Sequence, residues 1–450
     1  MQNKLTQLVS WNRYPRLECT LYRPERYSEL KPIGKSSLAR GAGLSYGDAA
    51  LNENGNVILT ERINRLLEFD EKGGVLTAEG GITLGEILNV IVPKGWFVPV
   101  TPGTQGVTLG GAVAADVHGK NHHIDGSFGQ FIDKLTLITP NQRINCSPNE
   151  NENIFWATIG GMGLTGIISE VRLKLKPIES AYIYTKYHAA ENLNQLFDLF
   201  SEPTIDDQYS VAWIDCLSSA GKLGRGIFMS GHHATLDELD SNTNKSPLST
   251  KMKSPLSIPV DFPRWALNPL SIKAFNALYY WTNARKQTPF ISDYSQFFYP
   301  LDNIQNWNRL YGKNGFIQYQ CVIPEQNAQE GIRLILEKIS SSQSSSFLAV
   351  LKRMGPQNKG MLSFPLAGYT LALDLTMNNE KLFKLLNELD KLVIQYGGKV
   401  YLAKDARLNK ESFREMYPRY DEWQTIKNQL DPNNIISSSL ARRLAIGATS

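Results

Sequence analysis

Long hydrophobic runs are missing from the 450 residues of this sequence. No stretch of about 18 consecutive apolar residues, the length that spans a bilayer, occurs in it. The first residues, MQNKLTQLVSWNRYPR, also lack the apolar centre of a secretory signal. We therefore expect neither a transmembrane helix nor a cleaved leader, and a protein that is soluble or peripheral to a membrane.

Cysteine and net charge are also scarce. The four cysteines, Cys19, Cys146, Cys216 and Cys321, lie far apart and form no C-x-x-C pair. This spacing indicates neither a metal site nor a disulfide framework, and we expect buried free thiols in a reducing compartment. The net charge of +4, from 47 basic and 43 acidic residues, is too small and too evenly spread to indicate a nucleic-acid partner.

Glycine, in contrast, is concentrated in three clusters within the first 170 residues: RGAGLSYGD at 40–48, PGTQGVTLGG at 102–111 and GGMGLTG at 160–166. Glycine lets the backbone approach a ligand and turn its N–H groups toward an anion. None of the clusters has the strand-G-x-G-x-x-G-helix fingerprint of a dinucleotide fold. One cluster alone is equally typical of a surface loop, but three indicate an extended phosphate-bearing cofactor.

The second cluster leads directly into His118 and Lys120, which suggests a reaction site beside the cofactor. The alternative for His118 is a structural histidine that bonds the loop backbone, and we assign His122 and His123 to loop structure. On a strand predicted at 316–322, Gln318 and Gln320 alternate with apolar residues and therefore point to one face.

The order of elements indicates at least two parts, in line with roughly two to three domains for this length. Strand and helix alternate near the N-terminus, where Thr83 and Glu86 form a capping box and Pro93 to Gly95 ends the helix. The character changes from about residue 181. Further strands are predicted at 57–60, 75–78 and 211–214, and helices at 328–340 and 379–396, the last with its leucines facing the core.

One biased segment, 241–257, is rich in Ser, Asn, Lys and Pro and is predicted to be a mobile loop. It precedes residues 262–286, in which aromatic side chains are interleaved with Arg and Lys. Such a mixture suits a lipid headgroup interface. The alternative is that these aromatics pack on a sheet, because Ile272, Phe275 and Tyr279 also have the spacing of a helix face turned to the core.

The motifs RGAGLSYGD, VPVTPGTQGVTLGGAVAADVHGKNHH, FWATIGGMGLTGII, FIQYQCVIP, SFLAVLKRMGP and YLAKDAR occur in one order along the chain. Through them the chain resembles, over nearly its whole length, the decaprenylphosphoryl-β-D-ribose oxidase family of the vanillyl-alcohol-oxidase superfamily. The resemblance implies an α+β, two-domain PCMH-type FAD-binding fold. Residues 1–180 and 399–450 would form the FAD domain, and residues 181–398 an inserted substrate domain with an antiparallel sheet flanked by helices.

The resemblance also implies a function, namely FAD-dependent oxidation of the 2-hydroxyl of a polyprenylphosphoryl pentose to the 2-keto sugar. This would be the first half of an epimerisation in cell-wall arabinan supply, completed by a separate short-chain NAD(P)H reductase. The location implied is the cytoplasm or the inner face of the bacterial plasma membrane, with peripheral contact. Two alternatives stay open: a soluble alditol or aldonolactone oxidase that acts on free sugars, and a non-catalytic flavin-binding protein.

The family's functional residues carry over by position. The cofactor set is Arg40, Gly41, Ala42, Gly43, Leu44, Ser45, Tyr46, Gly103, Thr108, Leu109, Gly110, Gly111, Ala115, Asp116, Val117, His118, Ile168 and Tyr401. The catalytic set is Lys404, His118, Lys120, Tyr46, Gln318, Gln320, Lys352 and Asp374. Lys404 would stabilise the developing alkoxide or the phosphate, and His118 or a bound water would take the hydroxyl proton.

The chain shows four departures from the family pattern, one of which is a pair of neighbouring residues. Leu44 stands where many superfamily members attach FAD through a histidine, so a dissociable FAD is expected. Ala372 replaces the cysteine that covalent inhibitors attack, and such compounds should lose that attachment. Phe298 and Tyr299 replace a Tyr-His pair and Thr370 replaces an asparagine, which leaves the identity of the sugar open.

Overall fold

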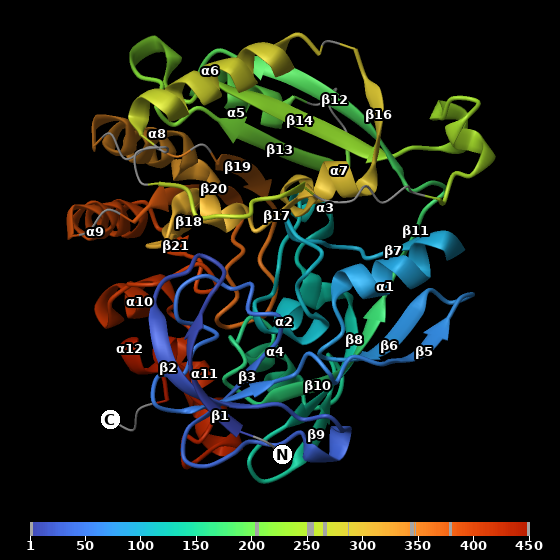
Figure 1. The fold of residues 1–450 in the computed structure, drawn as a ribbon, viewed down its shortest axis with the longest axis vertical. Helices are drawn as coiled ribbons and strands as arrows, with labels where there is room; N and C mark the ends of the chain where they lie inside the picture. The colour runs from blue at the N-terminus through green and yellow to red at the C-terminus, as the bar shows by residue number, and fades with distance from the viewer. Residues whose placement is uncertain are drawn as a thin grey trace.

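The computed structural model describes residues 3–202, 207–249, 256–263, 268–286, 288–342, 346, 348–377 and 380–447. The strands of the N-terminal part form small sheets in the lower half of Figure 1, and a large sheet with long helices occupies the upper half. The strands pair mostly antiparallel, and helices and strands are not in regular alternation. The expected α+β class is confirmed.

Two sheets build the N-terminal part. A four-stranded sheet in the order β1-β2-β4-β3 consists of β1 (Asn3–Val9), β2 (Arg16–Tyr22), β4 (Asn56–Leu59) and β3 (Ser37–Arg40). A five-stranded antiparallel sheet in the order β5-β6-β10-β8-β9 consists of β5 (Leu66–Asp70), β6 (Val75–Glu79), β10 (Ile167–Lys174), β8 (Ile132–Ile138) and β9 (Arg143–Cys146). A short pair, β7 (Trp96–Phe97) with β11 (Lys176–Pro177), adjoins them.

The large sheet has eight strands, and all of its described pairs are antiparallel. In spatial order they are β16 (Phe290–Asp293), β12 (Tyr182–Ala190), β14 (Gly226–His233), β13 (Tyr209–Ile214), β19 (Ala349–Met354), β20 (Gly368–Thr376), β18 (Phe316–Pro324) and β21 (Lys399–Val400). Separately, β15 (Leu256–Ser257) pairs parallel with β17 (Ile304–Gln305). The central strands β13 and β18 are buried on both faces because both faces are covered, and one face of β18, β19 and β20 also carries polar side chains.

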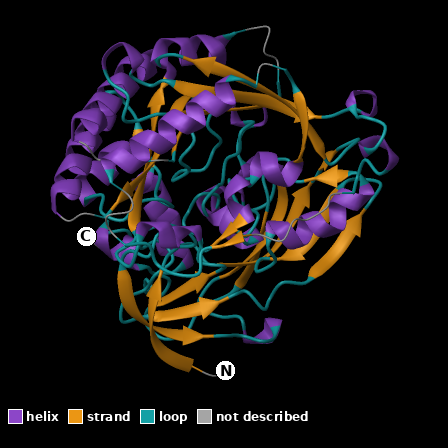
Figure 2. Ribbon diagram, turned by 45° about the horizontal axis from the view of Figure 1, so that its top comes forward, coloured by secondary structure: helices purple, strands orange, loops and turns teal. Residues whose placement is uncertain are grey.

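The helices of the upper half lie around the outside of its strands (Figure 2). On one face of the sheet pack α5 (Leu193–Ser201), α8 (Glu325–Ser342) and α9 (Glu380–Gln395). Over β12 and β14 on the other face packs α6 (Pro269–Ala284). The remaining described helices are α1 (Leu84–Ile91), α2 (Leu109–Ala114), α3 (His122–Asp125), α4 (Glu152–Thr158), α7 (Tyr294–Phe298), α10 (Lys410–Met416), α11 (Tyr420–Leu430) and α12 (Ser439–Arg443).

Local sequence signals explain several of these elements. Helix α1 begins at the predicted capping box, in which Glu86 N–H donates to Thr83 Oγ1 at 3.1 Å, and Gly95 closes the following turn with a φ of 79°. In α9 the leucines at 382, 386 and 389 are buried, as the helical spacing predicted. The strands predicted at 57–60, 75–78, 211–214 and 316–322 are confirmed within a few residues.

The C-terminal segment returns to the N-terminal sheets. The N–H of Ser37 in β3 donates to the carbonyl of Ile435 at 2.7 Å, and the Arg443 guanidinium forms two hydrogen bonds with Asp48. This agrees with the expected grouping of residues 1–180 with 399–450. The division itself stays a prediction, since β21 lies in the large sheet although it begins at residue 399.

Three further expectations can be compared with the described residues. All four cysteines are buried and unpaired, as predicted. Of the loop expected at 241–257, residues 241–249 contain short turns and Leu256–Ser257 is β15, while 250–255 lie outside the described residues. No described helix combines the length and apolar character needed to span a bilayer.

Candidate active site

A cavity of about 700 Å³ lies between the glycine-rich segments of the N-terminal part and one face of the large sheet. Most of the predicted residues meet there. Those that line it from the cofactor set are Arg40, Gly41, Ala42, Gly43, Leu44, Ser45, Tyr46, Gly103, Thr108, Gly110, Gly111, Ala115, Val117, His118, Ile168 and Tyr401, and those from the catalytic set also include Gln318, Gln320, Lys352 and Lys404. The placement is observed, and their roles remain predictions.

Residues 41–45 form a backbone cradle at one end of this cavity. None of their backbone N–H groups has an acceptor among the described residues, so all five can serve a ligand. A Cβ on Gly41 would lie 2.1 Å from Thr108 Oγ1, so only glycine lets the backbone come this close to Thr108. Unpaired N–H groups in a glycine turn are the donors that a pyrophosphate needs. This cradle fits the diphosphate of FAD.

Arg40 supports the cradle from beneath. Its Nη1 donates to the carbonyl of Ala50 at 2.9 Å and its Nη2 to that of Val9 at 2.7 Å. A Cβ on Gly43, whose φ is 66°, would lie 2.1 Å from the same Nη2. Arg40 therefore fixes the backbone of the cradle, and its guanidinium is largely engaged by carbonyl groups.

The opposite wall of the cavity is the face of β18, β19 and β20. Gln320 pairs with Ala372 across one ladder and Val350 pairs with Ala372 across the next, so these side chains share a face. Gln320 Nε2 donates to Thr370 Oγ1 at 3.1 Å and lies 3.0 Å from His118 Nε2. The wall thus combines polar groups from the sheet with the loop histidine.

Lys404 and Lys352 bring two ammonium groups to this wall. Lys404 Nζ lies 3.7 Å from the centroid of the Tyr46 ring, and among the described residues neither lysine forms an ion pair. Burial lowers the pKa of Lys352 to about 8. Burial also lowers the pKa of Lys404, against the opposing effect of Asp374. The wall is therefore suited to an anionic or hydroxylated ligand.

His118 is held between aromatic rings. Its ring centroid lies 5.5 Å from that of Phe364 and 5.4 Å from that of Tyr401, and Tyr401 donates to the carbonyl of Ala115 at 2.8 Å. Burial, followed by Lys352, lowers the pKa of His118 well below its usual value, so the imidazole is neutral. Its buried Nδ1 has no partner among the described residues. A ligand in the cavity would satisfy this atom.

Four predicted residues do not line the cavity and need a different account. Leu109 is fully buried in the core. Asp116 is also fully buried, and accepts hydrogen bonds from Ser127, Gly129, Asn358 and Ser363. Lys120 Nζ bonds the carbonyl of Phe297 and lies 4.1 Å from the centroid of its ring. Asp374 is fully buried on the same sheet face as the wall, directly opposite Gln318, and accepts from Gln318 Nε2 at 2.5 Å without lining the cavity itself. These residues support the side chains that line the site.

The family departures also have a place in the structure. The small side chain of Ala372 lines the cavity, and so does the apolar side chain of Leu44. Thr370 donates to the carbonyl of Cys321 at 2.8 Å, whereas Tyr299 is fully buried with its hydroxyl 2.6 Å from Thr101 Oγ1. Tyr299 does not line the cavity, and it can influence the shape of the cavity only through the loop that contains Thr101.

Sequence reasoning missed one wall entirely. Leu301, Asp302, Ile304, Gln305, Asn306 and Trp307 all line the cavity, and Trp11 joins them from the N-terminal segment. Asp302 accepts the backbone N–H of Gln105 at 2.9 Å, which ties this wall to the second glycine cluster. No spacing in residues 301–307 marks them as a site. The only available signal was the aromatic Trp307 at the end of a mixed stretch, LDNIQNW.

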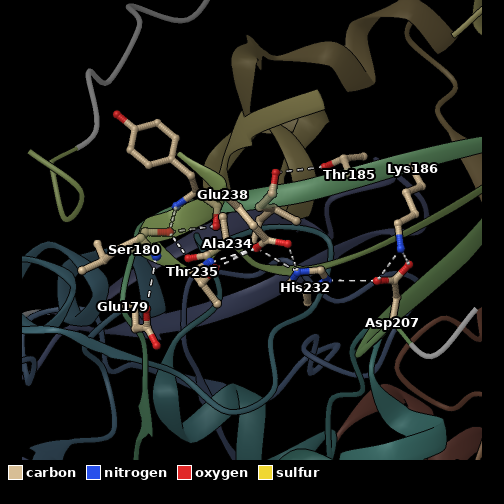
Figure 3. Close-up of polar contacts among 12 residues, drawn as sticks. Glu179, Ser180, Thr185, Lys186, Asp207, His232, Ala234, Thr235 and Glu238 are labelled. Carbon is tan, nitrogen blue, oxygen red and sulfur yellow. Dashed lines mark hydrogen bonds and ion pairs between the residues drawn. The ribbon is translucent and has the colours of Figure 1, made fainter. Parts of the chain in front are cut away.

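A separate polar cluster lies on β12, β14 and the adjoining turn (Figure 3). His232 Nδ1 lies 2.9 Å from Asp207 and its Nε2 lies 3.1 Å from Glu238. Lys186 also reaches Asp207, with 3.3 Å between the charged atoms. No member of this cluster lines the cavity, and its charged groups pair with one another. It is a structural network that fixes the turn at Glu238 to the sheet.

Comparison with known proteins gives consistent results. A family model described as "FAD binding domain" matches residues 33–147, and one described as "D-arabinono-1,4-lactone oxidase" matches residues 313–444. The first supports the PCMH-type fold, and it includes two of the three glycine clusters. FAD is thus the cofactor that both the match and the geometry of the cradle indicate.

Relatives cover most of the chain. A protein of Mycolicibacterium smegmatis named decaprenylphosphoryl-beta-D-ribose oxidase is 37% identical over 416 residues, which cover 92% of this chain and 90% of the relative. An uncharacterized protein of Streptomyces coelicolor from the mprA 5' region is 30% identical over 81% of this chain and 100% of its own length. L-gulonolactone oxidase 5 of Arabidopsis thaliana is 28% identical, but over only 28% of this chain and 22% of its own. The chain is an FAD-dependent oxidoreductase that belongs to the decaprenylphosphoryl-β-D-ribose oxidase family.

Proposed function

We propose that this enzyme oxidises the 2-hydroxyl of a polyprenylphosphoryl pentose, ribose-like, to the 2-keto sugar. One observation carries the proposal: the backbone cradle of residues 41–45 and the amino groups of Lys352 and Lys404 line the same cavity. The cradle supplies donors for the cofactor diphosphate. Lys352 supplies positive charge for the phosphate of a second ligand, and Lys404 serves the reacting hydroxyl group.

The sugar would be held by the amides of β18. Gln318 and Gln320 lie two residues apart on this strand and both line the cavity, where hydroxyl groups of a ligand can add to the bonds that their Nε2 atoms make with Asp374 and Thr370. Trp307 closes the site from the 301–307 segment, and its indole belongs to an aromatic cluster with Tyr46, Tyr311 and Phe316. A wall of this kind orients a small polar ring and excludes water.

The chemistry that FAD supplies when bound is acceptance of the hydride from the carbinol carbon. The chain must then receive the proton of the hydroxyl group. Burial lowers the pKa of Lys404 and raises that of Asp374, so Lys404 Nζ can be neutral near neutral pH. We assign Nζ of Lys404 as the acceptor of this proton, because the pKa of His118 is lowered too far for an efficient base. His118 then orients the ligand through a hydrogen bond to its Nδ1.

FAD is proposed to bind without a covalent link. Leu44 lies in the cavity at the position where many superfamily members carry an attaching histidine, and a leucine side chain offers no nucleophile. Acid precipitation of the purified protein should release all of the FAD into the supernatant. Yellow colour retained in the pellet would contradict this.

The ketone product requires a second enzyme for net epimerisation. A separate short-chain NAD(P)H reductase that returns hydride to the opposite face is the proposed partner. Its chemistry follows from the product, because a 2-keto sugar becomes the epimeric alcohol only when hydride is added from the other side.

The decisive experiment is anaerobic mixing of the purified holoenzyme with a polyprenylphosphoryl ribose in detergent, followed by flavin absorbance. We expect bleaching with the lipid-linked sugar. Lys404→Ala should slow the bleaching by at least about 100-fold because the proton acceptor is lost, whereas Lys359→Ala, on an exposed side chain, should not. Bleaching of Lys404→Ala as fast as wild type would refute the assignment of the proton.

The match of residues 313–444 to a lactone oxidase family supports one rival, an oxidase of free sugars. It predicts bleaching by xylitol-like alditols or aldonolactones, peroxide release in air, and no benefit from the prenyl phosphate. If neither type of sugar bleaches the flavin, the chain is a flavin-binding protein without this activity.

A further inference from the structure

Exposed apolar side chains are concentrated in one short part of the chain. Among the described residues, seven of the twelve exposed large hydrophobic side chains fall between residues 256 and 281: Leu256, Val260, Phe262, Leu270, Phe275, Leu278 and Trp281. A soluble protein rarely gathers such residues without a partner for them. They lie on α6 and on residues 256–262, which we call the strap.

Helix α6 has a buried side and an exposed apolar side. Ile272, Asn276 and Asn283 face the sheet, where Asn276 Nδ2 donates to the buried Asp215 at 2.9 Å. Leu270 and Trp281 lie eleven residues apart, close to three helical turns, and so share the opposite side with Leu278. Leu270 is 80% exposed, Leu278 is 62% exposed and Trp281 is 55% exposed. Packing on the sheet therefore accounts for only the inner side of the helix.

Continuity with the cavity favours a substrate-related partner. Tyr279 of α6 packs on Trp213, with 4.6 Å between ring centroids. Trp213 pairs with Val350 across β13 and β19, and Val350 lines the cavity. Directly opposed residues of an antiparallel pair share a face. Helix α6 thus covers the continuation of the sheet face that forms the cavity wall.

The strap reaches the same cavity from the other direction. Leu256 pairs with Ile304, which lines the cavity, and the N–H of Ile258 donates to the carbonyl of Gln305 at 3.0 Å. Gln305 both lines the cavity and is exposed, so the cavity reaches the surface here. Five residues separate the strap from the start of α6 at Asn268, a reach of at most about 20 Å. The opening and the exposed apolar side chains are therefore neighbours.

The charge of this region selects one kind of apolar partner. Between residues 241 and 292 the sequence has seven basic residues and a single acidic one, Asp261, whose carboxylate is paired with Arg13 at 2.5 Å. The Arg285 guanidinium lies 3.3 Å from the centroid of the Trp281 ring, beside the apolar face. Cations beside aromatic and aliphatic side chains are the composition that binds anionic lipid headgroups.

We propose that the outer side of α6 and the strap dock on an anionic phospholipid surface, with the cavity opening at that surface. A substrate whose prenyl chain stays in the bilayer then presents its phosphate and sugar to the cavity without leaving the membrane. This role in substrate delivery rests on the proposed function, but attachment to lipid does not.

The test is co-sedimentation of the full-length holoenzyme with phosphatidylcholine vesicles that contain phosphatidylglycerol. We expect binding that weakens with added salt and is absent with phosphatidylcholine alone. The double variant Leu278→Glu with Trp281→Glu should bind at least about tenfold more weakly. Leu5→Glu is the matched control, because Leu5 is 60% exposed on β1, far along the chain, and its change should leave binding intact.

Retained FAD and an unchanged circular dichroism spectrum will show that each variant is folded. Equal vesicle binding by wild type and double variant, or no binding to the anionic vesicles, would overturn the proposal. So would a wild-type dimer in size-exclusion chromatography that the double variant loses, since the face would then be covered by a second copy. Lys404→Ala should still bind vesicles, so a failure of the proposed catalysis cannot be mistaken for a failure of docking.

Discussion

Lys352 lies on β19 with its side chain at the cavity, and burial lowers its pKa to about 8. A phosphate ligand needs the protonated amine, which predominates below this pKa and is lost as the pH rises through it. We therefore predict that affinity for the phosphorylated substrate is constant below neutrality and falls above about pH 8. Fluorescence titration of the holoenzyme at a series of pH values measures it.

The matched variant is Lys352→Arg, because the guanidinium keeps its charge at every accessible pH. Its affinity should stay level through pH 9, even if it starts lower than that of wild type. Affinities of wild type and variant that fall together with rising pH would assign the titration to another group, such as Lys404.

Asp116 illustrates a residue whose position in a motif concealed its role. Its carboxylate accepts from Ser127 Oγ at 2.9 Å, from Gly129 N–H at 2.9 Å and from Asn358 Nδ2 at 2.7 Å. We predict that Asp116→Ala lowers the free energy of unfolding by about 3 kcal/mol, because several buried donors lose their acceptor. Urea unfolding measures this change. Asp421→Ala, at a side chain that is 92% exposed, should change it by less than about 0.5 kcal/mol.

At the scale of elements, α1 depends on the reciprocal bonds at its first turn. Thr83 N–H donates to Glu86 Oε2 at 2.7 Å while Glu86 N–H donates to Thr83 Oγ1. We predict that Thr83→Ala lowers the free energy of unfolding by about 1 kcal/mol. Thr83→Ser keeps the hydroxyl and should recover most of the loss in the same urea experiment. Equal losses for both variants would show that the methyl group matters more than the cap.

Elements with a local signal were predictable, and elements fixed by distant contacts were not. The capping box located α1, and leucines at helical spacing located α9, because both signals act within a few residues. Residues 301–307 became a wall of the cavity only through contacts with residues far away in sequence, such as the bond from Gln105 to Asp302. A single sequence contains no local pattern for such a contact.

The catalytic set shows the same limit. The alternation of Gln318 and Gln320 predicted a shared face, and the structure agrees. Which residues reach the cavity could not be predicted, because this depends on neighbouring strands and loops. Asp374 shares the face of Gln318 but does not line the cavity, and Lys120 is directed to the carbonyl of Phe297, although motif matching alone ranks both with Lys404.

At the scale of the whole molecule, the two ends of the chain jointly hold the cradle. The Arg443 guanidinium bonds Asp48 through two atoms, at 2.6 and 2.9 Å, and also lies 2.9 Å from a carboxylate oxygen of Asp405. Asp48 is the last residue of the glycine cluster that forms the cradle, so this contact fixes the segment that we expect to bind FAD.

We predict that Arg443→Ala lowers the free energy of unfolding by about 3 kcal/mol, since it leaves two buried carboxylates without their counterion. It should also weaken FAD binding, measured by recovery of flavin fluorescence on dilution. Arg333→Ala is the control, because this exposed arginine of α8 pairs, among the described residues, with Glu330 and Glu337 of its own helix and should have little effect. If Arg443→Ala loses stability but binds FAD with normal affinity, Arg443 stabilises the fold without holding the cradle, and the second prediction is wrong.

The contact between Arg443 and Asp48 also constrains biosynthesis. During translation the first glycine cluster leaves the ribosome hundreds of residues before its partner does. The nascent chain therefore cannot complete the cradle until Arg443 has left the ribosome, and flavin loading should follow that step. A shortage of cofactor would leave the chain in an open, protease-sensitive form.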